Sequence, residues 1–147
     1  MTNLFVMGSP RGQSPCVAHA CTACCRDTNM PLSLADIERI TALGHKLAEF
    51  SDSGDDGWMR LHNLDDHRCF FLSEKGLCTI HDSKPEGCRL YPFILDQDTA
   101  EVFRDSFCPF NAQFDPAPTT KEKVRELVVR LEDEAAARRD QAGRHRR

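Results

Sequence analysis

The chain has 147 residues and a formal net charge of −4, and charged residues make up 29% of it. A chain of this length normally folds as one domain that buries roughly 70% of the surface exposed by the unfolded form. The acidic balance leaves no broad basic surface to neutralise phosphates, which argues against nucleic acid as a partner. No apolar run approaches the ~20 residues of a membrane span, so no membrane contact is predicted.

Residues 1–15 contain Gly8, Pro10, Gly12 and Pro15 without any apolar period, which predicts a flexible N-terminal arm. This segment lacks the basic start and the apolar stretch of a secretion signal. The protein is therefore predicted to stay in the cytoplasm, where thiols are kept reduced.

The next elements are a compact loop over residues 16–25 and a helix that begins after Ser33. Ser33 is the predicted N-cap, and the Asp36 carboxylate lies in the first turn, where the helix dipole favours it. An interruption is expected at Gly44. Apolar residues recur at helical spacing along this segment and predict a helix packed over the cysteine loop: Leu34, Ile37, Ile40, Leu43, Leu47 and Phe50.

The middle of the chain predicts short strands separated by polar turns. Residues 51–57 are acidic and contain glycines, which indicates an exposed loop. Apolar runs bounded by turn residues predict short strands at 58–64, 70–72, 77–80 and 102–103, with turns at 73–76 and 96–98.

A last helix is predicted from Thr119 or Thr120, and its apolar stripe is Val124, Leu127, Val128, Leu131 and Ala135. The basic residues after it predict a disordered tail. We therefore expect an arm at 1–15, a metal-binding domain at 16–137 and a basic disordered tail at 138–147. The predicted fold class is α+β: a small single domain of loops and short strands around a cysteine-ligated metal centre, flanked by two amphipathic helices.

Eight cysteines are the most informative feature: Cys16, Cys21, Cys24, Cys25, Cys69, Cys78, Cys88 and Cys108. In a reducing compartment, closely spaced cysteines are more often metal ligands or redox groups than cross-links. Cys24 and Cys25 also oppose a simple disulfide framework, because neighbouring Cα atoms lie about 3.8 Å apart, less than the usual disulfide separation. Metal binding is favoured over disulfides and over inert buried thiols.

Thiolates suit both zinc and iron, and Cys21-x2-Cys24 is a short loop that can turn two sulfur atoms toward one ion. Consecutive side chains of an extended backbone point to opposite sides, so Cys24 and Cys25 are not expected to ligate the same ion. Two centres, or one centre with a spare thiol, remain open. The spacing Cys16-x4-Cys21-x2-Cys24 also matches plant-type ferredoxins, and Cys108 precedes a proline as in bacterial clusters, so an iron-sulfur cluster remains an alternative to zinc.

Several other residues are predicted to support the centre. Arg26, Arg68 and Arg89 each adjoin a cysteine, and their charge can offset thiolate charge and lower thiol pKa values. Tyr91 can cover the centre and exclude water. His19 and His81 lie among the cysteines and can replace a thiolate, with surface positions as the alternative.

These residues resemble the YkgJ-like cysteine-cluster family, described as zinc- or iron-chelating domains, to which flagellin lysine N-methylases also belong. The resemblance rests on Cys21-x2-Cys24-Cys25, on Cys69-Phe-Phe-Leu and on the block from Cys78-Thr-Ile-His through Lys84-Pro-x-x-Cys88-Arg-Leu-Tyr-Pro-Phe. The family's first motif would place another cysteine at Ala18. The resemblance implies metal chelation over roughly residues 16–109.

The predicted function is a cysteine-rich zinc- or iron(-sulfur)-binding protein with a structural or metal-carrying role. One alternative is an enzyme, either iron-sulfur or related to protein-lysine N-methylases. No nucleotide-binding glycine motif or nucleophile elbow supports it. A second alternative is an interaction module shaped by zinc. The metal ion is the predicted partner, and the sequence specifies no protein partner.

Overall fold

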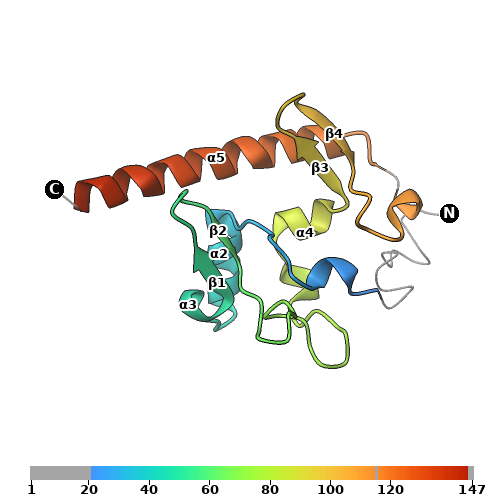
Figure 1. Ribbon diagram of the computed structural model, residues 1–147, viewed down its shortest axis with the longest axis horizontal. Coiled ribbons are helices and arrows are strands. Elements are labelled where there is room, and N and C mark those ends of the chain that lie inside the picture. The colour runs from blue at the N-terminus through green and yellow to red at the C-terminus, as the bar shows by residue number, and fades with distance from the viewer. Residues whose placement is uncertain (1–20, 115, 146–147) are drawn as a thin grey trace.

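The structure is a computed structural model that describes residues 21–114 and 116–145 (Figure 1). The predicted arm at 1–15, together with Cys16 and His19, lies outside the described residues. The described chain begins with a cysteine-bearing segment that contains one 3-10 turn, η2 (Ala23–Cys25).

Helix α2 (Leu34–Ala42) begins where the sequence predicted. The Ser33 hydroxyl accepts from the Asp36 N–H at 3.1 Å, and the Asp36 carboxylate accepts from the Ser33 N–H at 3.0 Å. This reciprocal capping box satisfies two backbone donors that the first helical turn leaves without partners. The predicted interruption at Gly44 is confirmed, because the backbone there has φ +103° and the short helix α3 (Leu47–Phe50) follows separately.

Two small antiparallel hairpins provide the sheet structure. Strand β1 (Ser51–Ser53) pairs with β2 (Met59–Leu61), and Ser51 lies opposite Leu61. Strand β3 (Phe93–Asp96) pairs with β4 (Glu101–Arg104), and Ile94 lies opposite Phe103. β2 and β4 confirm two predicted strands, whereas β1 falls in the predicted exposed loop. Its three residues can join a ladder because Trp58 O accepts from Gly54 N, which closes the hairpin.

The predicted strands at 70–72 and 77–80 are wrong. This region is a series of turns joined by one isolated bridge between Leu72 and Cys78. The turn predicted between them is confirmed, since Gly76 N donates to Ser73 O at 2.9 Å. Phe71, Leu72 and Ile80 are still buried, but they belong to turns, and Leu77 is 61% exposed.

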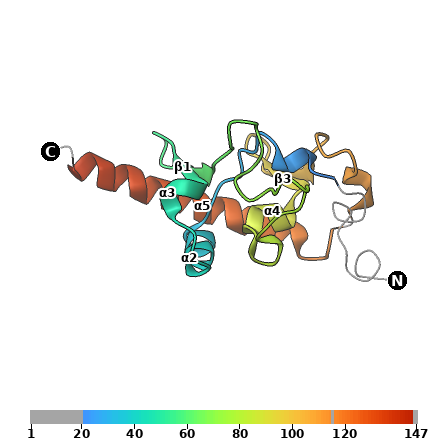
Figure 2. The same cartoon turned by 90° about the horizontal axis from the view of Figure 1, so that it is seen from below.

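The last part of the chain carries η3 (His81–Ser83), α4 (Glu86–Leu90), η4 (Asn111–Gln113) and the long helix α5 (Thr120–His145). α5 contacts α4, β3 and β4 along its N-terminal half, and its C-terminal end projects past the other elements (Figures 1 and 2). Residues 138–145 are thus helical, which corrects the predicted disordered tail. The helix continues because Arg138 Nη1 donates to Gly57 O at 3.0 Å and Arg139 Nη1 donates to Asp56 O at 2.6 Å.

Two groups of buried side chains stabilise these elements. One comprises Leu32, Ile40, Phe50, Leu61, Cys69, Phe71, Leu72 and Ile80. The other lies along α5, where the predicted residues Val124, Leu127, Leu131 and Ala135 are buried. The predicted α+β class and the small single domain are confirmed. None of the described helices combines the length and the apolar character that crossing a membrane requires.

Candidate metal centre

Four thiols from four separate segments lie close enough to affect one another's charge: those of Cys24, Cys69, Cys78 and Cys88. The negative charges that Cys69, Cys24 and Cys78 would carry as thiolates all raise the pKa of Cys88, although burial is the larger cause of the increase. Cys69 and Cys78 also repel one another. In Figures 1 and 2 the blue 3-10 turn with Cys24 and the yellow helix α4 with Cys88 lie side by side. Segments up to 64 positions apart in the sequence therefore bring their sulfur atoms into one region.

Cys69 is the most constrained of these thiols. Its residue is only 6% exposed, and its N–H donates to Cys25 O at 2.8 Å, which ties it to the first cysteine segment. Burial raises the pKa of Cys69, while the backbone N–H groups of Phe71 and Leu72 act in the opposite direction. Such donors favour the thiolate over the thiol, but burial outweighs them, so the pKa of Cys69 is raised in the metal-free protein.

Cys78 has a similar environment with fewer donors. Burial raises the pKa of its thiol, and the Ile80 N–H hydrogen-bonds to the sulfur and lowers it. The isolated bridge to Leu72 and the bond from Thr79 N to Phe71 O, 2.7 Å long, hold this turn against the turn that follows Cys69. The turn that follows Cys69 and the turn that follows Cys78 therefore lie next to each other.

Of the adjacent pair, Cys24 interacts electrostatically with Cys88 and Tyr91. Cys25 packs against the buried apolar group that contains Phe71, as Cys78 and Cys88 also do.

Cys88 lies in the middle of α4, whose packing leaves no space beside Gly87. A Cβ at Gly87 would overlap the Met30 sulfur, so the absence of a side chain lets α4 approach the segment that leads into α2. This close approach brings the α4 backbone next to the first cysteine segment.

Cys108 and Tyr91 lie at the β3–β4 end of this region. Cys108 is 4% exposed, and the Tyr91 hydroxyl donates to Asp105 Oδ2 at 2.6 Å. Burial raises the pKa of Tyr91, and Asp105, Cys24 and Cys108 add to the increase. Tyr91 is therefore close enough to Cys24 and Cys108 for their charges to affect its hydroxyl. Cys21 is half-buried at the start of the described chain.

The three arginines predicted to offset thiolate charge hydrogen-bond to oxygen atoms. Arg26 Nε donates to Thr22 Oγ1 at 3.2 Å, Arg68 Nε donates to Asp66 Oδ2 at 2.6 Å, and Arg89 Nη2 donates to Asp82 O. Adjacency to a cysteine in the sequence did not by itself indicate where each guanidinium group points.

Lys84 is a cation that acts on the thiols, although no such role was predicted for it from the sequence. Its charge lowers the pKa values of both Cys78 and Cys88. Its position between these cysteines, directly before Pro85, was the signal that pointed to it. His81, the predicted alternative ligand, is exposed, and burial and the Lys84 charge lower the pKa of its ring.

The donor chemistry of this region fits a soft-ligand metal. Four thiols supply the donor type that zinc and iron prefer, and backbone N–H groups already face two of the sulfur atoms. Within residues 21–114 and 116–145, no three His, Cys, Asp or Glu side chains are close enough together to form a coordination shell. The sulfur atoms are therefore neighbours that would have to move closer together to bind one ion.

A family model, CxxCxxCC, described as "Putative zinc- or iron-chelating domain", matches residues 15–109, well over half of the chain. The chain belongs to this family. Neither the search of curated proteins nor that of solved structures found a match. The matched range of the CxxCxxCC family contains all eight cysteines and ends before α5, so the long helix is an addition to the metal-chelating part.

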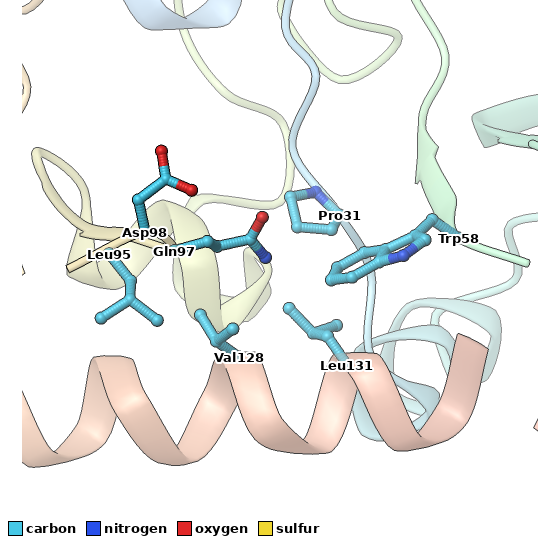
Figure 3. Close-up of a pocket in the computed structure, with 7 residues that line it drawn as sticks. All are labelled: Pro31, Trp58, Leu95, Gln97, Asp98, Val128 and Leu131. Atoms are coloured by element: carbon cyan, nitrogen blue, oxygen red, sulfur yellow. The ribbon is translucent and has the colours of Figure 1, made fainter. Parts of the chain in front are cut away.

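A separate groove lies beside α5 and has a volume of about 430 Å³. Its lining side chains converge from α5, the β3–β4 turn and the segments at Pro31 and Trp58, as Figure 3 shows: Pro31, Trp58, Leu95, Gln97, Asp98, Val128 and Leu131. No cysteine lines it. The groove is therefore distinct from the thiols of the CxxCxxCC domain.

Proposed function

We propose that this chain is a metal-binding domain in which Cys24, Cys69, Cys78 and Cys88 hold one zinc or iron ion in a structural role. Membership of the chelating family supports metal binding in general. The choice of ligands rests on one observation, the raising of the Cys88 pKa by the charges of the other three thiols. Groups that repel one another as bare anions are stabilised when a divalent cation lies among them.

The structural role follows from where the four ligands come from. They lie on η2, on the two turns of residues 69–80 and on α4, and most of this region is turn rather than ladder. Four protein thiolates fill a tetrahedral shell and leave no position for substrate, as in structural zinc sites. A metal bound here would cross-link these turns, so its binding free energy would contribute to folding.

The bound metal would supply positive charge that keeps the thiols deprotonated. The chain supplies the remaining stabilisation, because the N–H groups of Phe71, Leu72 and Ile80 face sulfur and the Lys84 charge lowers two thiol pKa values. Hydrogen bonds to metal-bound sulfur tune the site and orient the ligands.

The roles of the other residues singled out in the sequence remain predictions. Cys16, Cys21 and Cys108 can serve a second centre or an iron-sulfur cluster, and Arg26, Arg68, Arg89 and Tyr91 can line it. The enzyme and interaction-module alternatives also remain predictions, and so does the cytoplasmic location.

Adjacent cysteines provide the test of the ligand set. Cys24→Ser should remove stoichiometric metal from protein purified without air, because serine is a poor ligand for zinc and iron. Cys25→Ser should retain one metal per chain, because the proposed ligand set contains Cys24 and not its neighbour. Metal content measured by inductively coupled plasma mass spectrometry distinguishes them. Equal metal content in the two variants would contradict the proposed ligand set.

A further inference from the structure

A buried carboxylate links α2 to the segment that carries Cys88. Asp36 is 0% exposed, and its two oxygen atoms face different elements. Oδ2 accepts from Ser33 N at 3.0 Å and completes the capping box of α2. Oδ1 accepts from Glu86 N, the first residue of α4, also at 3.0 Å. The Asp36 side chain therefore caps its own helix and also accepts a hydrogen bond from the first N–H of α4.

Arg39, one turn later on α2, holds the residues just before α4. Its Nη2 lies 2.9 Å from Asp36 Oδ1 and donates to Lys84 O at 2.9 Å, while its Nε donates to Ser83 O at 3.2 Å. The guanidinium group thus compensates the buried charge and satisfies two backbone carbonyls at once. A rigid planar fork of donors is suited to such an arrangement, and a lysine is not.

Together the two side chains fix the backbone from Ser83 to Glu86. This stretch joins Cys78 to Cys88, and Cys88 follows Glu86 by two residues. The same stretch carries Lys84, whose charge acts on both thiols. The Glu86 carboxylate is held by two further side chains, since Arg130 Nη1 on α5 donates to Oε2 at 2.6 Å and the Ser33 hydroxyl donates to the same oxygen at 3.4 Å.

We propose that Asp36 and Arg39 are positioning residues for the metal centre, which set the distance between the Cys78 and Cys88 sulfur atoms. This inference rests on the proposed function. A capping box needs only Ser33 and one oxygen of Asp36. The second oxygen, together with Nε and Nη2 of Arg39, serves the ligand-bearing segment instead, 44 to 50 residues away in the sequence. Partners that orient a metal ligand typically change metal affinity by about 10- to 100-fold when removed.

Glu86 allows this contact to be removed without changing a residue of α2. Glu86→Pro deletes the N–H that donates to Asp36, and Glu86→Ala keeps it. Both variants lose the carboxylate that accepts from Arg130 and from the Ser33 hydroxyl. Proline is favoured at the first position of a helix. Pro85 already has φ −54° and ψ 150°, the extended conformation that a residue before proline prefers. The two variants therefore form a matched pair that differs in one hydrogen bond.

Cobalt(II) affinity and the visible spectrum of the cobalt-loaded protein are the readouts, because cobalt bands report tetrahedral thiolate coordination. We expect Glu86→Pro to bind about 10-fold more weakly than Glu86→Ala, with shifted cobalt bands, at equal unfolding midpoints of the metal-free proteins. Equal affinities and identical spectra would overturn the positioning role.

If Glu86→Pro does not fold, the cobalt affinity of Arg39→Lys tests the positioning role instead. Arg125→Lys is its control, because Arg125 donates to Ala100 O and not to the segment before Cys88. Weaker cobalt binding by Arg39→Lys alone supports the role, and equal binding overturns it. Failure of the proposed function would look different. The wild-type chain would then bind no stoichiometric metal, or Cys88→Ser would bind as well as wild type.

Discussion

Alkaline pH should destabilise the metal-free protein much more than the metal-loaded protein. Burial raises the pKa values of Cys69, Cys78 and Cys88 above their ordinary value of 9.0. Above that pH the unfolded chain releases these protons while the folded chain retains them. Since the folded state then binds more protons than the unfolded state, the free energy of unfolding falls as pH rises.

The magnitude follows from the number of thiols. Each thiol that is protonated only in the folded state lowers the free energy of unfolding by about 1.4 kcal/mol per pH unit, between its unfolded and its folded pKa. This window is widest for Cys88, whose pKa is raised most strongly, and solvent screening narrows it for the partly exposed Cys78. A typical domain is stable by about 5–15 kcal/mol, so the metal-free protein should lose a substantial part of its stability as the pH rises above 9. Bound metal removes this dependence, because the ligating thiols have already lost their protons.

Urea unfolding at about pH 7, 8.5, 9.5 and 10.5, with chelator or with added zinc, measures both dependences. Cys88→Ser should remove the largest share of the alkaline loss of stability in the metal-free protein, because Cys88 has the most strongly raised pKa of the three thiols. The reasoning is refuted if the metal-free midpoint stays level over this range, or if it falls as steeply with zinc as without it.

Two further predictions concern α5. Leu131→Ala should cost about 2–3 kcal/mol in urea unfolding, near the low end for a buried leucine because Leu131 borders an open groove, whereas Val129→Ala, 56% exposed, should change stability by less than about 0.5 kcal/mol. Equal costs would mean that α5 does not pack by its predicted face. Arg138→Ala should free the loop at Gly57 at a cost of about 1 kcal/mol and shift Trp58 fluorescence to longer wavelength. Unchanged emission would count against that contact.

Local signals were the most readily predicted from the sequence. The capping box of Ser33 and Asp36 spans four residues, and the buried stripe of α5 follows one helical period, so both could be identified without tertiary information. The second role of Asp36 could not, because Glu86 lies 50 residues away and meets it only through folding.

The cysteine-rich middle of the chain shows why periodicity misled. Phe71 and Ile80 are buried, as strand residues would be, yet the backbone around them turns so that N–H groups face the sulfur atoms of Cys69 and Cys78. Burial there reflects packing around the thiols rather than a ladder. The positions of the charged side chains could not be predicted for a similar reason. The Arg68 guanidinium group pairs with Asp66, while the Lys84 charge lowers the pKa values of two thiols.

The most direct test of the proposed centre is the metal content and absorption spectrum of the wild-type chain and Cys88→Ser, both purified without air. We predict one zinc or iron per wild-type chain and less than about a tenth of that in Cys88→Ser, since three remaining thiols leave the tetrahedral shell incomplete. A colourless protein with zinc identifies zinc, and visible thiolate-to-iron absorption identifies iron. Wild-type protein without stoichiometric metal, or a Cys88→Ser variant that retains it fully, would contradict the account.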